Sequence, residues 1–225
     1  MNETLPYESE RRAMIENQLR RRGIRDPRVL EAMFVVPRHE FVAPGLVRRA
    51  YDDRPLPIGQ SETISQPYMV AVMTEAARVQ TGDQVLEVGA GCGYQAAIMS
   101  WLGAKVFAVE RNPDLAEATR RRLDRLGFEG IQIMTGDGTE GYTLAAPYQV
   151  IVVTAASPPK VPQPLLDQLA EGGRLVIPVG ELDHQELRLV FKHGYEFATR
   201  KLDQCQFVPL IGKYGWPDTK LLGRS

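Results

Sequence analysis

The hydrophobic pattern of the chain changes near residue 81, and the two parts predict different structures. From there on, short apolar runs alternate with amphipathic segments, which is typical of a parallel sheet covered by helices on both faces. The fourth apolar run lacks polar interruptions, as expected of a central parallel strand. The predicted strands cover residues 84–88, 105–109, 131–134, 149–153 and 174–179.

Capping and breaking residues bound the helices between these strands. The clearest helix has Asn112 as its N-cap, Pro113 at its first position and Gly127 beyond its end. A helix that precedes the fifth strand is expected to stop at Gly172-Gly173. The two other helices in this part are predicted over residues 94–102 and 162–170.

The carboxyl-terminal part predicts antiparallel strands. Two extended runs, 187–192 and 195–201, are joined by His193-Gly194, which is typical of a hairpin. A further extended run covers 205–210. The fold class is therefore α/β, with a mostly parallel central sheet, helices on both faces and antiparallel strands at the carboxyl-terminal end.

The first eighty residues predict a helical cap on this sheet. Gly23 ends the first helix and Asp26 caps the second. The predicted helices cover residues 8–22, 27–35 and 67–79. Because no linker separates the two parts, we expect a single domain with a helical cap at 1–80 and a core at 81–225.

Charge and composition limit the kinds of partner that the protein is expected to bind. The chain has 225 residues, with 27 Lys and Arg against 28 Asp and Glu, so a net charge of −1 does not indicate a nucleic-acid partner. Of its three arginine runs, two fall on predicted helices that also carry acids, so solvated helix faces are expected. Two cysteines form neither a disulfide framework nor a zinc pattern, and three histidines suggest no metal site. Without a signal peptide or a membrane-length apolar run, a cytoplasmic protein with no membrane partner is expected. We also expect a monomer.

A glycine-rich loop, EVGAGCGY at 87–94, follows the first strand of the alternating part. In an open parallel sheet, ligands bind outside the carboxyl ends of the strands, and glycines let the backbone approach a ligand closely. The spacing is G-x-G-x-G, and Tyr94 stands where the dinucleotide fingerprint G-x-G-x-x-G has its third glycine. This difference disfavours NAD as the ligand of the loop. The backbone at Gly89, Ala90 and Gly91 is the candidate cofactor-binding surface.

Three acidic residues near this loop are candidate ligand contacts. Glu110 ends the second strand, where an acid can accept hydrogen bonds from ribose hydroxyls, although a solvated strand end paired with Arg111 is the alternative. Asp137 can accept from an adenine amino group beside the backbone of Gly138, or can simply form an Asp-Gly turn. Glu87 lies in an apolar strand, where an unpaired carboxylate is costly. The cationic groups of S-adenosylmethionine would offset that cost, as would a partner from the protein.

Segments along most of the chain, from about residue 14 to 216, resemble the protein-L-isoaspartate (D-aspartate) O-methyltransferase family. The matching segments are VPR at 36–38, LPIGQ at 56–60, TISQPYM at 63–69, LEVG at 86–89, VER at 109–111, GDG at 136–138, VVTAA at 152–156, PVG at 178–180 and FVPL at 207–210. There are two departures. Cys92 stands where the family usually has Ser or Thr, as a steric replacement or as a redox-sensitive thiol, and Ile211 stands where some members have Thr.

The resemblance implies a Rossmann-like class I methyltransferase that uses S-adenosylmethionine. Its substrates would be isoaspartyl-containing proteins and peptides, methylated on the free carboxylate of L-isoaspartyl residues, with D-aspartyl residues as a further expectation. The methyl ester then recyclises to a succinimide, which initiates repair. Two other classes stay open: a different S-adenosylmethionine enzyme acting on a small molecule or RNA, and a binding module without catalysis. An NAD oxidoreductase is disfavoured by Tyr94.

The resemblance places the active-site serine at Ser65. The groups around it are mild, which suits the reaction: a carboxylate is already anionic and the methyl donor is already cationic, so alignment is the main requirement. The alternative for Ser65 is an N-cap of the helix that Pro67 opens. Thr63 and Ile64 are expected to contact the cofactor. The substrate contacts are expected at Ser65, Gln66, Val208 and Pro209, of which the last two can also be ordinary sheet packing.

Overall fold

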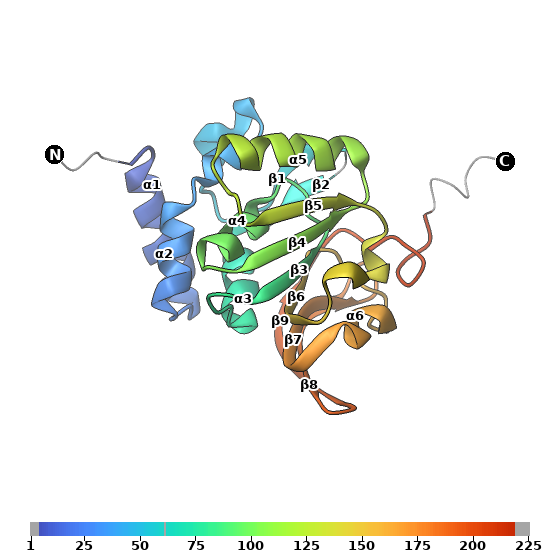
Figure 1. Cartoon of the computed structure of the whole chain (residues 1–225). Coiled ribbons are helices and arrows are strands. Elements are labelled where there is room, and N and C mark those ends of the chain that lie inside the picture. Colours follow the sequence, from blue (N-terminus) through green and yellow to red (C-terminus); the bar gives the residue numbers. More distant parts are fainter. Residues whose placement is uncertain (1–4, 61, 219–225) are drawn as a thin grey trace.

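The core of the structure is a seven-stranded sheet with the order β5-β4-β3-β6-β7-β8-β9 (Figure 1). This computed structural model describes residues 5–60 and 62–218, so residues 1–4, 61 and 219–225 of the predicted cap and core lie outside the described residues. The first five strands in this order, β5, β4, β3, β6 and β7, are parallel. Strand β8 pairs antiparallel with β7, and β9 pairs antiparallel with β8. The expected fold class is confirmed. The strands are β3 (Gln84–Val88), β4 (Lys105–Glu110), β5 (Ile131–Thr135), β6 (Tyr148–Val153), β7 (Leu169–Gly180), β8 (Gln185–His193) and β9 (Glu196–Cys205).

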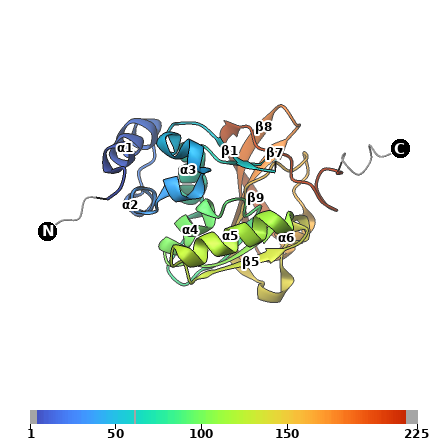
Figure 2. The same cartoon turned by 90° about the horizontal axis from the view of Figure 1, so that it is seen from above.

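Helices cover both faces of this sheet because successive side chains of each strand point to opposite faces. In β3, Val85 packs into a cluster with α3, α4 and α5, whereas Leu86 and Val88 pack into a second cluster with α6. Helices α1 and α2 lie at the opposite side of the molecule from the last described residues, which are coloured red (Figures 1 and 2). The helices are α1 (Glu8–Ala13), α2 (Pro27–Val35), α3 (Pro67–Ala77), α4 (Tyr94–Trp101), α5 (Pro113–Arg125) and α6 (Gln163–Asp167).

The cap and the core share one hydrophobic cluster. It begins at Met14 and Leu19, continues through α2, α3 and α4, and reaches Leu187 and Leu189 on β8. Burial of such contiguous apolar surface is the main stabilising contribution to a fold. Among the described residues, no helix has the length and apolar composition needed to cross a membrane.

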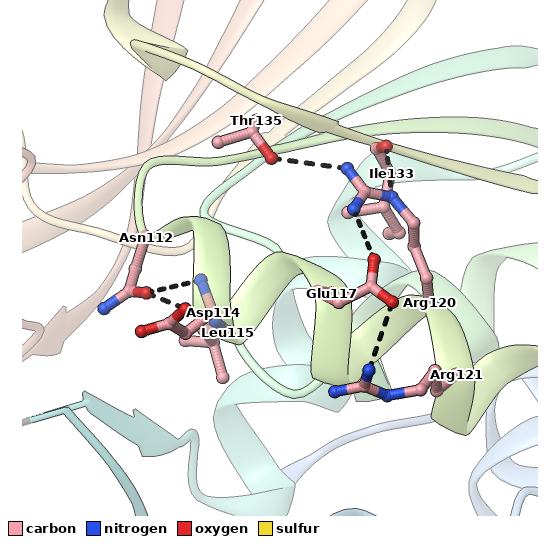
Figure 3. Close-up of polar contacts among 8 residues, drawn as sticks. All are labelled: Asn112, Asp114, Leu115, Glu117, Arg120, Arg121, Ile133 and Thr135. Carbon is pink, nitrogen blue, oxygen red and sulfur yellow. Dashed lines mark hydrogen bonds and ion pairs between the residues drawn. The ribbon is translucent and has the colours of Figure 1, made fainter.

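Helix α5 begins as its sequence predicts (Figure 3). Oδ1 of Asn112 accepts hydrogen bonds from the amides of Asp114 at 3.0 Å and Leu115 at 3.2 Å. These two amides have no partner inside the helix, so the side chain satisfies donors that would otherwise be unpaired. Pro113 occupies the first helical position, as expected, and the N-cap prediction is confirmed.

The arginine run of α5 is only partly a solvated face. Arg121 is exposed and pairs with Glu117 at 3.2 Å. Arg120 also pairs with Glu117, but its guanidinium reaches the neighbouring strand, donating to the Ile133 carbonyl at 3.1 Å and to Oγ1 of Thr135 at 3.3 Å (Figure 3). Arg120 therefore also links α5 to β5 by hydrogen bonds.

The first predicted helix is not a regular α-helix throughout. After α1 the chain forms a π-helical turn over Met14–Leu19 and a 3₁₀ turn over Arg20–Arg22, and it ends at Gly23 as predicted. Met14 and Leu19 are five residues apart and both are fully buried. The wider π turn brings residues at this spacing to one face, which an α-helix would not do.

The predicted helix over 162–170 is too long. Helix α6 ends at Asp167, and β7 starts at Leu169, so the pair Gly172-Gly173 lies inside a strand and does not stop a helix. The register between β6 and β7 shifts at this point. Gly172 has φ of 70°, and a Cβ at Gly173 would lie 2.7 Å from the Ala170 carbonyl oxygen. These glycines are therefore needed for the irregularity in the strand.

The predicted helical cap also contains a short hairpin that the sequence pattern does not indicate. Strands β1 (Leu56–Gly59) and β2 (Glu62–Ile64) pair antiparallel, with an irregularity between Pro57 and Gly59. The strands are short, and Pro57 and Gly59 disfavour a strand assignment, so no alternating pattern is recognisable. The hairpin places the segment that contains Ser65 next to the sheet.

Candidate active site

A cavity of about 980 Å³ lies at the carboxyl ends of β3, β4 and β6. Strand β3 has β4 on one side and β6 on the other, so the strand order reverses here, and such a point is where open α/β sheets bind ligands. Nearly all of the predicted site residues line this one cavity, although they come from distant parts of the chain. These residues are Thr63, Ile64, Ser65, Gln66, Glu87, Gly89, Ala90, Gly91, Glu110, Gly138, Val208 and Pro209.

The glycine loop passes close to the neighbouring strand at Gly89. This residue has φ of 89°, and a Cβ there would lie 2.6 Å from Oγ1 of Thr154. The Thr154 hydroxyl lies 2.5 Å from the Gly89 carbonyl oxygen and 3.1 Å from that of Val88, so it holds the turn from the end of β6. A side chain at position 89 would therefore displace the contact that shapes the loop.

Helix α5 holds the other side of the loop. The hydroxyl of Thr119 donates to the Gly91 carbonyl at 2.6 Å, and Nη1 of Arg122 donates to the Cys92 carbonyl at 3.1 Å. Cys92 itself is buried, and this burial raises the pKa of its thiol. A buried thiol that is harder to ionise is poorly suited to redox reactivity, so these properties favour the steric replacement of Ser or Thr.

Glu110 is built into the site and is not a solvated strand end. It is 7 % exposed, and its two carboxylate oxygens accept hydrogen bonds from the amides of Gly91 and Asn112, each at 2.9 Å. Arg111, the alternative partner, instead pairs with Asp218 at 2.6 Å. Each carboxylate oxygen has a second acceptor position, so Glu110 can also accept from hydroxyl groups in the cavity.

Glu87 is a buried acid without a hydrogen-bond partner among the described residues. It is 1 % exposed, and neither of its carboxyl oxygens has a hydrogen-bond partner within the described residues. Burial, with a smaller contribution from the charge of Glu110, raises the pKa of Glu87 well above its usual range. A cationic or hydrogen-bonding ligand in the cavity would supply the missing partner, which fits the ammonium group of S-adenosylmethionine.

Replacing Glu87 with Gln is expected to change how the stability of the ligand-free protein depends on pH. Because the folded-state pKa of Glu87 is raised, its contribution to stability is fully present below the ordinary pKa of about 4.5 and is lost as pH rises through the folded-state pKa. The thermal midpoint of the wild type should therefore fall relative to that of Glu87→Gln between about pH 4.5 and pH 7. Exposed Glu129→Gln is the control for loss of one charge. Parallel profiles for Glu87→Gln and wild type would contradict the expectation.

Asp137 is the one predicted site residue that does not line the cavity. Its Oδ1 accepts hydrogen bonds from the amide of Thr139 at 2.9 Å and the hydroxyl of Thr139 at 2.7 Å, and its Oδ2 accepts from the amide of Lys213 at 2.7 Å. The carboxylate thus ties the carboxyl-terminal segment to the end of β5, while Gly138 faces the cavity. Its contact with adenine stays a prediction.

Ser65 lies just before α3 and does not cap this helix. The N-cap position belongs to Gln66, and no side chain caps the first turn. Within the described residues, the Ser65 hydroxyl has no hydrogen-bond partner, and Ser65 lines the cavity. The capping alternative is therefore not what the structure shows, and the hydroxyl remains available to a ligand.

The segment Val208–Leu210 lies against the end of β6 on one side of the cavity. The amide of Ala156 donates to the Val208 carbonyl, and the amide of Leu210 donates to the Ala156 carbonyl, both at 2.8 Å. This edge of the segment is therefore occupied by the protein. Pro209 has no amide proton, so its carbonyl is the backbone group it can offer to a substrate.

The cavity is also lined by residues that the sequence patterns do not indicate, among them Thr154 and Arg22. Thr154 follows β6, and a hydroxyl at the carboxyl end of a central strand is the signal that could have indicated it. Arg22 comes from the first helical segment, and its guanidinium lies 3.3 Å from the ring centroid of Tyr68. No pattern in the sequence links Arg22 to the sheet. Within the described part of the chain, no group of three or more His, Cys, Asp or Glu side chains is arranged to hold a metal ion.

The parallel sheet, the glycine loop after β3 and the acid that ends β4 together define the class as a Rossmann-like methyltransferase. Known proteins agree with this. Over residues 9–215 the chain matches the family model described as protein-L-isoaspartate(D-aspartate) O-methyltransferase. It is 55 % identical to the protein-L-isoaspartate O-methyltransferase of Methanoculleus marisnigri over 94 % of this chain and 96 % of the relative. It is 51 % identical to that of Methanoregula boonei over 96 % of this chain and 99 % of the relative.

Solved structures give the same result. A protein-L-isoaspartate O-methyltransferase superposes with a TM-score of 0.81 at 31 % identity, covering 91 % of this chain and 67 % of the other. One from Plasmodium falciparum, in complex with S-adenosyl-L-homocysteine, has a TM-score of 0.77 at 26 % identity, covering 89 % of this chain and 98 % of the other. The chain belongs to the protein-L-isoaspartate(D-aspartate) O-methyltransferase family. The expected family, enzyme class and S-adenosylmethionine dependence are thereby confirmed at the level of the family.

Proposed function

We propose that Ser65 orients the free carboxylate of an isoaspartyl residue for methylation. The observation that carries this proposal is a serine hydroxyl in the cavity wall that neither caps α3 nor bonds elsewhere within the described residues. It lies at the amino-terminal end of α3, where the helix dipole favours an anion. One hydrogen bond from this hydroxyl fixes the carboxylate and leaves its second oxygen free to react.

The main requirement of the reaction is that the protein aligns the acceptor carboxylate with the methyl donor. S-adenosylmethionine supplies, when bound, a methyl group on a cationic sulfur. The acceptor carboxylate is ionised at neutral pH, so no residue has to remove a proton from it. Correct placement of two reactants can contribute about 7–11 kcal/mol to lowering a barrier. The segment TISQPYM at 63–69 suits this demand, because it contains no Lys or Arg that would pair tightly with the carboxylate and reduce its nucleophilicity.

The cofactor would be held by the residues around the glycine loop. Glu110 is proposed to accept from the ribose hydroxyls, since it lines the cavity and each of its oxygens has a second acceptor position. Glu87 is proposed to pair with the ammonium group, which would satisfy its unpartnered carboxyl. Close backbone contacts are assigned to the loop at Gly89, Ala90 and Gly91, and Thr63, Ile64, Asp137 and Gly138 are proposed to complete the cofactor site.

The substrate peptide is proposed to enter beside Ser65, between Gln66 and the segment Val208–Pro209. Both sides line the same cavity. The product would be a methyl ester that recyclises without the enzyme to a succinimide, whose hydrolysis returns part of the residue to normal aspartate.

The same proposal extends to the organisation of the chain. The cap at 1–80 and the core at 81–225 are proposed to form a single domain, because one hydrophobic cluster includes residues of both. A net charge of −1 supports a protein that acts without a nucleic-acid partner. We propose that the protein is cytoplasmic and acts as a monomer.

The proposed activity is tested with matched peptides that differ only in one residue. A peptide containing L-isoaspartate should accept a labelled methyl group as a base-labile ester, whereas its L-aspartyl twin should not, because the cavity is proposed to place only the isoaspartyl carboxylate beside Ser65. A D-aspartyl peptide tests the second activity. Equal labelling of the isoaspartyl and aspartyl peptides would contradict the specificity. A wild type that binds cofactor but labels neither peptide would support a binding module.

A further inference from the structure

A buried arginine, Arg38, holds the backbone of Ser65. Its side chain is fully buried, and Nη2 donates to the Ser65 carbonyl at 2.7 Å while Nε donates to the Ala50 carbonyl at 2.7 Å. Within the described residues, this is the only hydrogen bond that Ser65 makes. Ser65 lies between β2 and α3, outside regular structure, so neither a strand ladder nor a helix fixes its position. The Arg38 guanidinium is the side-chain group that binds the Ser65 backbone.

The same guanidinium also contacts the cofactor side of the cavity. It lies 5.0 Å from the centroid of the Tyr94 ring, and Tyr94 lines the cavity directly after Gly93, the last glycine of the loop. Arg38 therefore touches the element that carries the proposed acceptor contact and the element that follows the glycine loop. A change in its side chain would alter the position of one relative to the other.

The surroundings of Arg38 do not make it an obvious stabilising residue. Within residues 5–60 and 62–218, no carboxylate forms an ion pair with it, and its Nη1 has no hydrogen-bond partner. A buried charge without a counter-ion and with an unsatisfied donor is costly. The position of Arg38 between Ser65 and Tyr94 gives a reason for retaining an arginine there.

We propose that Arg38 is a positioning residue, which fixes Ser65 relative to the glycine loop and so sets the distance between the acceptor carboxylate and the methyl donor. This inference rests on the proposed role of Ser65. Misplacement by about 1 Å can reduce a rate about 10²-fold, so a residue behind the cavity can control turnover without touching either reactant.

The first test compares Arg38 with a matched control, Arg11. Arg11 is also buried and also donates to backbone carbonyls, those of Pro6, Phe34 and Val35, but it does not line the cavity or contact Ser65. Arg38→Lys and Arg38→Gln are expected to lower kcat between about tenfold and 10²-fold, because neither side chain reproduces both hydrogen bonds. Arg11→Lys should lower thermal stability and keep kcat within about twofold. The dissociation constant for S-adenosylhomocysteine, measured by calorimetry below all melting temperatures, should stay within about threefold in every variant.

The second test asks whether Arg38 acts through Ser65. In a Ser65→Ala background, Arg38→Lys should lower kcat by no more than about twofold, because the hydroxyl that it positions is gone. A full loss in that background overturns the positioning role and leaves the role of Ser65 intact. Conversely, a Ser65→Ala protein with wild-type kcat refutes the proposed function itself.

Two further outcomes would reject the positioning role. A folded Arg38→Gln protein with wild-type kcat shows that the guanidinium is not needed to place Ser65. If neither Arg38 variant folds while Arg11→Lys does, Arg38 is a structural residue.

Discussion

Replacing Ser65 with Ala should lower kcat for an isoaspartyl peptide about 10²–10³-fold, the effect seen when one preorganised hydrogen-bond donor is removed from an active site. The affinity for S-adenosylhomocysteine should change less than about threefold, because the glycine loop and Glu110 are untouched. The melting temperature should also stay close to that of the wild type, since the hydroxyl does not cap α3.

Methyl transfer at saturating cofactor and peptide, calorimetric binding and thermal unfolding test these three expectations. Ser65→Thr is the matched control, because it keeps a hydroxyl at the same place and should retain a substantial part of kcat. If Ser65→Ala loses several degrees of melting temperature together with activity, the serine has a structural role that the contacts of α3 do not indicate. If Ser65→Ala has the kcat of the wild type, Ser65 has no role in methyl transfer.

Replacing Gly89 with Ala should weaken cofactor binding about 10²-fold. A left-handed backbone costs an L-residue about 1–2 kcal/mol, and the added Cβ would lie 2.6 Å from Oγ1 of Thr154. Crowding of a packed site adds about 1–3 kcal/mol, and each 1.4 kcal/mol corresponds to a tenfold change in affinity. Part of this strain is expected to appear as lower stability and part as a displaced loop.

Gly172→Ala provides the control for this experiment. Gly172 also has positive φ, at 70°, but a Cβ there meets no atom within 4 Å, and the residue does not line the cavity. This variant should lose some stability and keep the affinity of the wild type for S-adenosylhomocysteine, measured by calorimetry. Equal losses of affinity in both variants would indicate that backbone strain anywhere in the sheet, and not the contact with Thr154, determines binding.

The sequence predicts the core of this protein well because the core depends on local patterns. Apolar strands, the Asn112 cap and the terminating glycines each encode one element within a few residues. The predicted helix bounds are wrong where contacts between residues far apart in the sequence determine the structure. The helix over 162–170 was too long because the register between β6 and β7, and not helix propensity, places Gly172-Gly173 in a strand. The π turn at Met14–Leu19 likewise follows from which faces are buried.

The candidate site follows the same rule. Glu110 and the glycine loop could be predicted, because a loop after a strand and an acid at the end of the next strand must meet at one edge of a parallel sheet. The lack of a partner for Glu87 could be suspected from its apolar surroundings, but only the structure shows that none is supplied among the described residues. Arg38 and Thr119 act across long sequence separations, and nothing near them in the chain indicates which carbonyl they would meet.

The glycine loop owes its shape to side chains from three other elements, Glu110 on β4, Thr119 on α5 and Thr154 beyond β6. The loop therefore loses its conformational freedom when the chain folds. A ligand that binds afterwards does not have to offset the entropic cost of ordering the loop. The same eight residues excised as a peptide would not keep this conformation. Recognition by this loop is thus a property of the assembled fold, although the motif is written in one short stretch of sequence.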